Sequence, residues 1–390
     1  MRAASAWALV AIIAVCASVS WVDARWPVSL AEIPVFILSL AWVFHLLVRR
    51  RIPKGSVVLI PLAAAVAWMG IQILIRATVD LWRTELALLY WLCALAVVFT
   101  CLQVFSDLAW RIRFTRALMW LSLAVCVISL SQYFTGNQKI FGLFETNYDP
   151  AFVFGPFVYH SHFAAFAELT LPLALYGAFL GGDVGLLDSL AAATLYACVV
   201  VSASRAGFIL ATIELLAAPL LMLRRALISS RRAAVGGIPI LAMAVILVLA
   251  AGPGRLFARF AVRDNIRPEL ANSSLAMFKD HLLLGVGLGN WATVYPAYSR
   301  FDDGLYANQA HNDWVQWAAE GGVPFLAMMI WIAIWAIPRG LRSVWGIGVP
   351  IVFLHCLIDY PVQNAAVAIV FFALLSALAF EGREPGRQQV

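Results

Sequence analysis

Long apolar runs, separated by short polar breaks, occupy most of this chain of 390 residues. A helix that spans the hydrocarbon core of a bilayer needs about 20 mostly apolar residues, and about twelve runs suit that requirement. Two of the runs are short, so their ends are the hardest to place. The predicted spans are 3–22, 30–48, 56–75, 85–105, 117–134, 161–180, 187–203, 206–223, 238–251, 322–337, 344–358 and 361–380.

One long polar segment, 252–321, interrupts this pattern. We therefore expect an all-α polytopic membrane protein with about twelve transmembrane helices and one long outer segment that contains short helices. Residues 1–22 resemble a signal peptide, but they lack a second arginine and a clear small-residue cleavage pattern. We interpret them as an uncleaved first helix.

The composition favours the same class. Apolar residues make up 63% of the chain, charged residues make up 12%, and the mean hydropathy is +0.88. Soluble domains are roughly 45–50% apolar and about 25% charged, and a soluble fold of this length could not bury so much apolar surface. The net charge of +6 comes without a soluble basic domain, so we do not expect nucleic acid as a partner. All six cysteines fall within predicted spans, which excludes a disulfide framework or a zinc-binding spacing.

The distribution of basic residues predicts the orientation, because cytoplasmic loops are enriched in Lys and Arg. A cytoplasmic N-terminus places 16 of the 27 basic residues on the inner side. The segments 135–160 and 252–321 and the turns at 204–205 and 359–363 then face the periplasm. We expect a multi-pass protein of the bacterial inner membrane, and a cytoplasmic location of 270–310 would contradict everything that follows.

Arginines recur every four residues at the start of the outer segment, which on one helix would form a continuous basic face. These are Arg255, Arg259, Arg263 and Arg267. One interpretation is an interfacial helix that pairs with anionic lipid headgroups. The other is a clamp for a lipid-linked phosphate, since the planar guanidinium group binds phosphate oxygens in a bidentate manner.

The end of the outer segment predicts a short helix. Asp313 and Gln316 have the spacing of a capping box, and Gly321 and Gly322 suit a helix end. His311 would then lie just before a helix N-terminus, where backbone N–H groups and the helix dipole favour an anionic phosphate. A single histidine is more often structural, so the residue alone leaves both interpretations open.

Three charged residues lie near or within predicted spans. Arg205 sits in a turn at the outer boundary, where charge is costly and often functional, although snorkelling to the headgroups would also explain it. Glu168 and Glu214 lie deeper, and the sequence assigns them no partner. The glycine-rich run 285–290 has no surrounding βαβ unit, so we interpret it as a tight turn rather than a dinucleotide site.

Several segments together resemble the O-antigen ligase and polymerase family of bacterial membrane glycosyltransferases. They occur in the family's order across roughly residues 150–365, and their joint pattern is far more specific than any one of them. The segments are GPFVYHSHFA at 155–164, SRAG at 204–207, Arg267, AMFKDH at 276–281, GVGLGN at 285–290, His311 with Asn312, AEGG at 319–322 and HCLIDYP at 355–361.

The resemblance implies transfer of a glycan from an undecaprenyl-diphosphate carrier to an acceptor hydroxyl at the periplasmic face. It implies catalytic roles for three residues and substrate-binding roles for four. The catalytic residues are His311, Arg267 and Arg205, and the substrate-binding residues are Arg263, Asn312, His162 and His160. No Asp-x-Asp motif stands in an outer loop, so we expect no metal and no other cofactor, with cationic side chains stabilising the leaving diphosphate. Whether His311 acts as general base or as a phosphate ligand stays open.

We expect an N-terminal group of transmembrane helices at 1–134 and a catalytic membrane region at 135–390. The acceptor, whether a glycan, lipid A core or a protein, cannot be identified from these residues, and a polymerase that extends lipid-linked repeats is the main alternative to a ligase. A transporter or flippase is less compatible, because transporters usually show internal repeats and polar sites at the membrane midplane. A purely structural membrane scaffold is the third alternative.

Overall fold

The computed structural model describes residues 1–381 with short gaps, and the described part is helical. The gaps are residues 23, 136–138, 147, 150, 151, 182–184, 253, 262–265 and 301–305, together with the side chain of Arg255. Outside the helices, the described residues form two isolated bridges, Ile140 with Phe144 and Phe154 with Phe157, and no strand. The predicted all-α class is confirmed.

The elements follow the chain in this order. The helices are α1 (Arg2–Ser18), α2 (Trp26–Val48), α3 (Leu59–Leu74), α4 (Leu81–Phe105), α5 (Leu108–Phe134), α6 (His160–Glu168), α7 (Leu171–Leu180), α8 (Gly185–Val201), α9 (Arg205–Arg224), α10 (Ser230–Ala251), α11 (Gly254–Ala261), α12 (Ile266–Asp280), α13 (Trp291–Val294), α14 (Asp313–Ser343), α15 (Gly348–His355) and α16 (Ala365–Ala377). Short 3₁₀ helices are η1 (Tyr295–Ala297), η2 (Pro361–Gln363) and η3 (Leu378–Phe380).

Seven helical segments of the described chain are long and apolar enough to cross a membrane, namely α2, α4, α5, α6 with α7, α9, α10 and α14. Four shorter apolar segments, α1, α3, α8 and α16 with η3, contain 10–17 residues. The predicted span 344–358 contains only α15, and its 8 residues are too few to cross the bilayer at 1.5 Å per residue. The structure therefore supports a multi-pass membrane protein, while the predicted count of twelve is not confirmed.

Apolar side chains cover the outward faces of the helices at the periphery of the bundle. On α2, Leu40 is 68% exposed and Phe44 is 70% exposed, and on α10 Leu249 is 67% exposed. Soluble monomers rarely expose continuous apolar faces of this kind, whereas lipid tails accept them. The inner faces pack into one large core, in which α4 lies against α2, α3 and α16.

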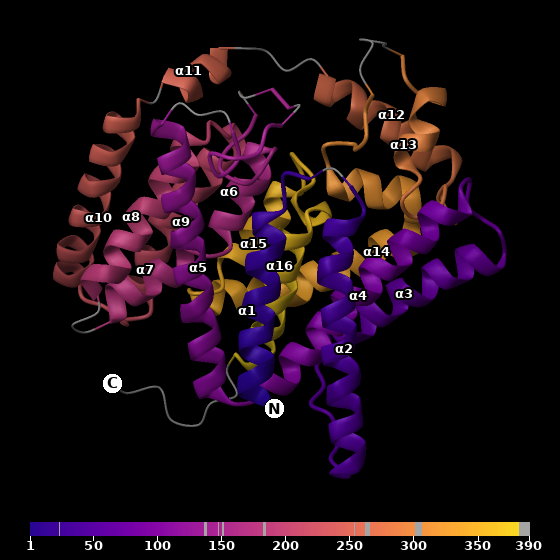
Figure 1. The fold of residues 1–390 in the computed structure, drawn as a ribbon, viewed down its shortest axis with the longest axis horizontal. Helices are drawn as coiled ribbons and strands as arrows, with labels where there is room; N and C mark the ends of the chain where they lie inside the picture. Colours follow the sequence, from indigo (N-terminus) through magenta and orange to yellow (C-terminus); the bar gives the residue numbers. More distant parts are fainter. Residues whose placement is uncertain are drawn as a thin grey trace.

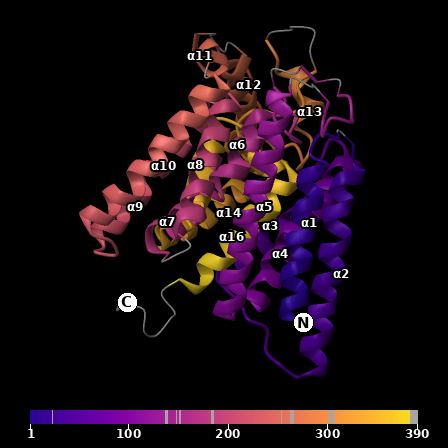
Figure 2. The same cartoon turned by 60° about the vertical axis from the view of Figure 1, so that its left-hand side comes forward.

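The outer segment lies at one end of the bundle. Helices α11, α12 and α13 all lie at the end opposite the N-terminus, with α11 on one side of that end and α12 and α13 on the other (Figures 1 and 2). Its short helices agree with the prediction, and α11 is attached to the bundle because Leu256 is buried against Val200 and Ala203. Which side of the membrane this end faces stays a prediction.

Two details of the predicted helices differ from the structure. The span 161–180 is divided into α6 and α7, since Pro172 has no backbone N–H and is accommodated in the first turn of α7. At α14 the cap is Asn312 rather than Asp313, and its side-chain oxygen accepts from the N–H of Val315 at 3.1 Å. The predicted helix end is present as a break at Gly322, where φ is 66°, and α14 continues beyond it as an apolar span.

Candidate functional site

A buried carboxylate, Asp359, joins the long outer segment to the turn between α15 and η2. Its Oδ2 accepts from Nη2 of Arg267 at 3.1 Å, and its Oδ1 lies 3.3 Å from Nδ1 of His311. The Asp359 side chain is fully buried, whereas those of Arg267 and His311 are 26% and 21% exposed. The carboxylate thus holds two residues side by side while leaving part of each accessible.

Asp359 carries a negative charge at neutral pH. Burial alone would raise its pKa, but the hydrogen bond from His311 and the positive charge of Arg267 outweigh burial and lower the pKa below the ordinary aspartate range. The local backbone fixes its position, because the N–H of Asp359 donates to the carbonyl of His355 at 2.9 Å and its own carbonyl accepts from the N–H of Asp313 at 3.2 Å. The ends of α15 and α14 are therefore bound to each other at this carboxylate.

His311 occupies the position directly before the cap of α14. Its φ is 50°, a left-handed conformation that non-glycine residues adopt at a cost of about 1–2 kcal/mol. Beside an ionised Asp359, Nδ1 carries the ring proton, so that Nε2 becomes the acceptor. Aromatic rings fix the plane, with the centroid of Tyr360 at 4.9 Å and that of Tyr159 at 5.6 Å. This arrangement orients one nitrogen for proton transfer.

Arg267 is the second residue of α12 and is held by three groups. Besides the pair with Asp359, Nη1 donates to the carbonyl of Ile358 at 3.2 Å, and a side-chain hydrogen bond joins it to Tyr159. Burial is the main reason that the pKa of Tyr159 rises to about 12, with a further increase from Asp359 that Arg267 and Arg259 oppose. Tyr159 is therefore a neutral hydrogen-bonding group at physiological pH.

His160 and His162 form part of the aromatic wall behind the site. His160 stacks on Phe152 with centroids 5.7 Å apart, and His162 meets Tyr360 edge-on at 4.8 Å. Both side chains are buried. Among the described residues, neither Nδ1 of His160 nor Nε2 of His162 has a hydrogen-bond partner, which is unusual for buried nitrogen atoms.

Arg205 is the first residue of α9, where Ser204 caps the helix by accepting from the N–H of Gly207 at 3.1 Å. Its Nη1 donates to the carbonyl of Arg259 on α11 at 3.4 Å. The guanidinium of Arg259 lies over the ring of Phe152 at 5.0 Å, so a chain of contacts leads from Arg205 to the aromatic wall.

The predicted basic face does not continue along one helix. Arg259 lies on α11 and Arg267 lies on α12, because α11 ends at Ala261 and α12 begins at Ile266. The two helices are well separated in the view of Figure 1. Arg263 lies outside the described residues. Two arginines of this series thus approach the aromatic wall from different elements.

Part of the chain matches a known protein family. Residues 190–330 match the family model described as O-antigen ligase, and this range includes Arg205, Arg267 and His311. This part of the chain is thus similar to O-antigen ligases. A search of curated proteins finds no match to the chain.

The match supports the family resemblance, and with it a lipid-linked glycan transferase of the ligase or polymerase type in polysaccharide biosynthesis. The matched residues lie wholly within the predicted catalytic region 135–390. The division of the chain at residue 134 stays a prediction.

Asn312, which also lies within the matched residues 190–330, forms hydrogen bonds within the protein. Its oxygen caps α14, and its Nδ2 donates to the carbonyl of Leu357 at 2.8 Å. These bonds join the start of α14 to the turn that carries Asp359. A direct contact between Asn312 and a substrate stays a prediction.

Asp359, Tyr159 and Tyr360 were not among the predicted site residues. The signal for Asp359 was present, since it is a charged residue at a predicted span boundary within the family-like segment 355–361. The structure also gives Glu168 a partner, His355, whose Nδ1 lies 2.9 Å from Oε2 with both side chains fully buried. For Glu214 neither carboxyl oxygen has a hydrogen-bond partner within the described part of the chain.

Proposed function

We propose that this protein transfers a glycan from an undecaprenyl-diphosphate carrier to a hydroxyl group of an acceptor at the periplasmic face of the bacterial inner membrane. The observation that carries the proposal is the buried Asp359, which holds a cationic group, Arg267, beside a proton acceptor, His311. The transfer of a glycan from a diphosphate requires both functions at one place.

His311 acts as the general base in this proposal. Its Nε2 takes the proton of the acceptor hydroxyl as the acceptor oxygen forms a bond to the anomeric carbon of the donor. The bond between that carbon and the diphosphate oxygen breaks, and the undecaprenyl diphosphate leaves with the electron pair. Asp359 stabilises the imidazolium that forms and keeps the ring in the required tautomer.

Arg267 and Arg205 stabilise the leaving diphosphate without a metal ion. Guanidinium groups form charge-assisted hydrogen bonds to phosphate oxygens, and such bonds strengthen as negative charge develops. Arg259 lies between Arg205 and the aromatic wall, which supports a shared role in this clamp. The resemblance also assigns Arg263 to the clamp and His160 and His162 to the substrate.

The experiment is complementation of a deletion strain with single-site variants, followed by gel analysis of the surface glycan. Arg205→Ala, Arg267→Ala and His311→Ala should each abolish glycan assembly while immunoblots show normal protein levels. Lys279→Ala is the matched control, since it removes an exposed cation from the same helix as Arg267 and should leave assembly unchanged. Full activity in any of the three variants would remove that residue from the site.

The same gels separate a ligase from a polymerase. If long chains are lost and one repeat is retained on the acceptor, the protein is a polymerase. Complete loss from the acceptor, with accumulation of lipid-linked polymer, identifies a ligase. Purified protein in liposomes with a lipid-linked donor tests the transporter alternative, because movement of the donor without transfer would contradict an enzyme. Reporter fusions within 270–310 test the periplasmic orientation.

A further inference from the structure

A cavity of about 320 Å³ lies between the N-terminal helices and the matched residues 190–330. Arg83, Ala87 and Trp91 on α4 form one wall. Trp317 and Glu320 on α14 lie in the opposite wall. The cavity is large enough for a sugar residue, since ligand pockets begin at about 300 Å³.

The lining has the chemistry of a carbohydrate site. Two tryptophans, Trp91 and Trp317, offer apolar ring surface for the C–H face of a sugar, and the amides of Gln309 and Gln363 offer donors and acceptors for its hydroxyl groups. These are few polar groups within a largely apolar wall, the usual composition of a small-molecule pocket.

The charges in the lining favour an uncharged ligand over a diphosphate. The guanidinium of Arg25 pairs with Glu32, and that of Arg83 lies 3.7 Å from Asp80. Glu320 adds a further carboxyl group to the wall. Two arginines thus stand against three carboxyl groups, so the cavity lacks the excess of positive charge that a phosphate-binding site needs.

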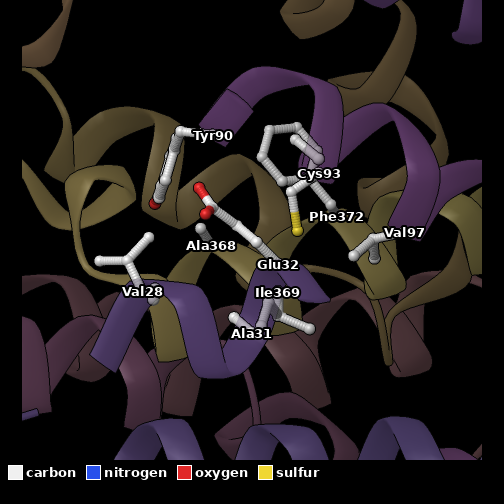
Figure 3. Close-up of a pocket in the computed structure, with 11 residues that line it drawn as sticks. Val28, Ala31, Glu32, Tyr90, Cys93, Val97, Ala368, Ile369 and Phe372 are labelled. Atoms are coloured by element: carbon white, nitrogen blue, oxygen red, sulfur yellow. The ribbon is translucent and has the colours of Figure 1, made fainter. Parts of the chain in front are cut away.

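Arg25 is held by Glu32, which lines a second and much smaller cavity. This cavity, of about 20 Å³, shares Val28 and Tyr90 with the larger one and has room for about one water molecule. The Glu32 carboxylate points between Tyr90 and Cys93 in its wall (Figure 3). The Glu32 side chain is only 6% exposed, and its Oε2 accepts from Nη2 of Arg25. A buried carboxylate thus fixes one guanidinium group in the wall of the larger cavity.

The larger cavity adjoins the Asp359 site through the backbone. Gln309 is two residues from His311, so their Cα atoms lie at most about 7.6 Å apart. Gln363 donates to Oδ1 of Asp313 at 3.2 Å, and the N–H of Asp313 donates to the carbonyl of Asp359 at 3.2 Å. The cavity and the Asp359 site therefore share the start of α14 and the turn that follows α15, which places a sugar in the cavity next to the site.

We propose that this cavity binds an uncharged sugar residue of the acceptor glycan, so that the N-terminal helices select the acceptor. The inference rests on the proposed function, because it takes His311 as the base that receives the proton of the acceptor. The donor diphosphate and the acceptor sugar then bind at two different places in the molecule. The donor is held by arginines of the outer segment, and the acceptor is held by α4, α14 and the residues around Gln309.

The test fills the cavity without removing a polar group. Ala87→Phe places a ring in the lumen, and Leu89→Phe is the control on the same helix, since Leu89 is 40% exposed on the outer face. The probe is the oligosaccharide released by mild acid from the envelope of the deletion strain, which carries the unmodified acceptor. By calorimetry, wild type and Leu89→Phe should bind it equally, and Ala87→Phe should bind at least tenfold more weakly.

Several outcomes would overturn the proposal. Equal binding by Ala87→Phe would exclude the cavity as the site, and selective loss of binding of the oligosaccharide released from the lipid-linked donor would assign it to the donor. If Ala87→Phe fails to fold, Gln309→Ala is the second variant, and its affinity for the oligosaccharide should be roughly three- to tenfold lower because one hydrogen bond is lost.

A different result would test the proposed function alone. If the wild-type protein binds the oligosaccharide but shows no transfer in liposomes, the proposed function is contradicted and the cavity assignment is unaffected.

Discussion

The described part of the molecule contains two histidine–carboxylate pairs on neighbouring segments, and their surroundings differ. His311 and Asp359 are 3.3 Å apart at the end of α14, with the histidine partly exposed. His355 and Glu168 are 2.9 Å apart in the interior of the bundle, with both side chains fully buried. The pairs are adjacent, because the N–H of Asp359 donates to the carbonyl of His355. The chemical groups are alike, and only the first pair has a surface that a substrate can reach.

This difference separates a pair suited to chemistry from a pair suited to holding position. A general base must come within hydrogen-bond distance of the proton that it takes, and the side chain of His311 is partly exposed. Glu168 on α6 and His355 on α15 instead connect two helices whose ends carry the site, with Tyr159 before α6 and Asp359 after α15. We therefore expect the first pair to determine the rate of transfer and the second to determine the stability of the site.

The largest effect is expected for Asp359→Asn. The amide keeps the shape of the carboxyl group but loses the charge that fixes the tautomer of His311 and balances Arg267. By analogy with other histidine–carboxylate pairs, the rate of transfer should fall by roughly 10²–10⁴-fold. The measurement is transfer in liposomes with a lipid-linked donor, at equal amounts of purified protein. An activity within twofold of wild type would show that Asp359 is only structural.

A loss of stability rather than of chemistry is expected for Glu168→Ala. Removing one partner of a buried pair leaves the other without compensation, at a cost of about 3–5 kcal/mol, so the unfolding temperature in detergent and the protein level should fall. The double variant Glu168→Leu with His355→Leu should recover much of the stability, since apolar residues can replace a buried pair. A single variant that unfolds like wild type would contradict the assignment.

The positions of the helices along the sequence were easier to predict than their arrangement in space. The apolar runs located most helices, and the start of α14 was placed correctly because polar residues and glycines mark local boundaries. The runs did not reveal that 344–358 contains only α15, since a short buried helix and a span have the same composition. They also could not show that Arg259 and Arg267 lie on separate helices.

The partners of the charged residues were beyond sequence reasoning for a different reason. Asp359 contacts His311 across 48 positions of the chain, and Glu168 contacts His355 across 187. No local pattern encodes such distances, because they depend on how whole helices pack. The family-like segments indicated that Arg205, Arg267 and His311 act together, and the geometry adds that Asp359 joins the last two.

The smallest effect is expected for Tyr159→Phe, which removes one hydroxyl group at the first pair and keeps the ring against His311 and Tyr360. The lost hydrogen bond to the charged Arg267 corresponds to about 1.5–3 kcal/mol at most, and Arg267 retains its bonds to Asp359 and Ile358. Since the pKa of Tyr159 is raised to about 12, the residue does not act as the base, and the pH profile of transfer should keep its shape while the rate falls about three- to tenfold. Rates measured between pH 6 and 9 for both proteins provide the check. A changed profile would mean that Tyr159 takes part in proton transfer, and the distinction between the chemical pair and its supporting residues would then need to include it.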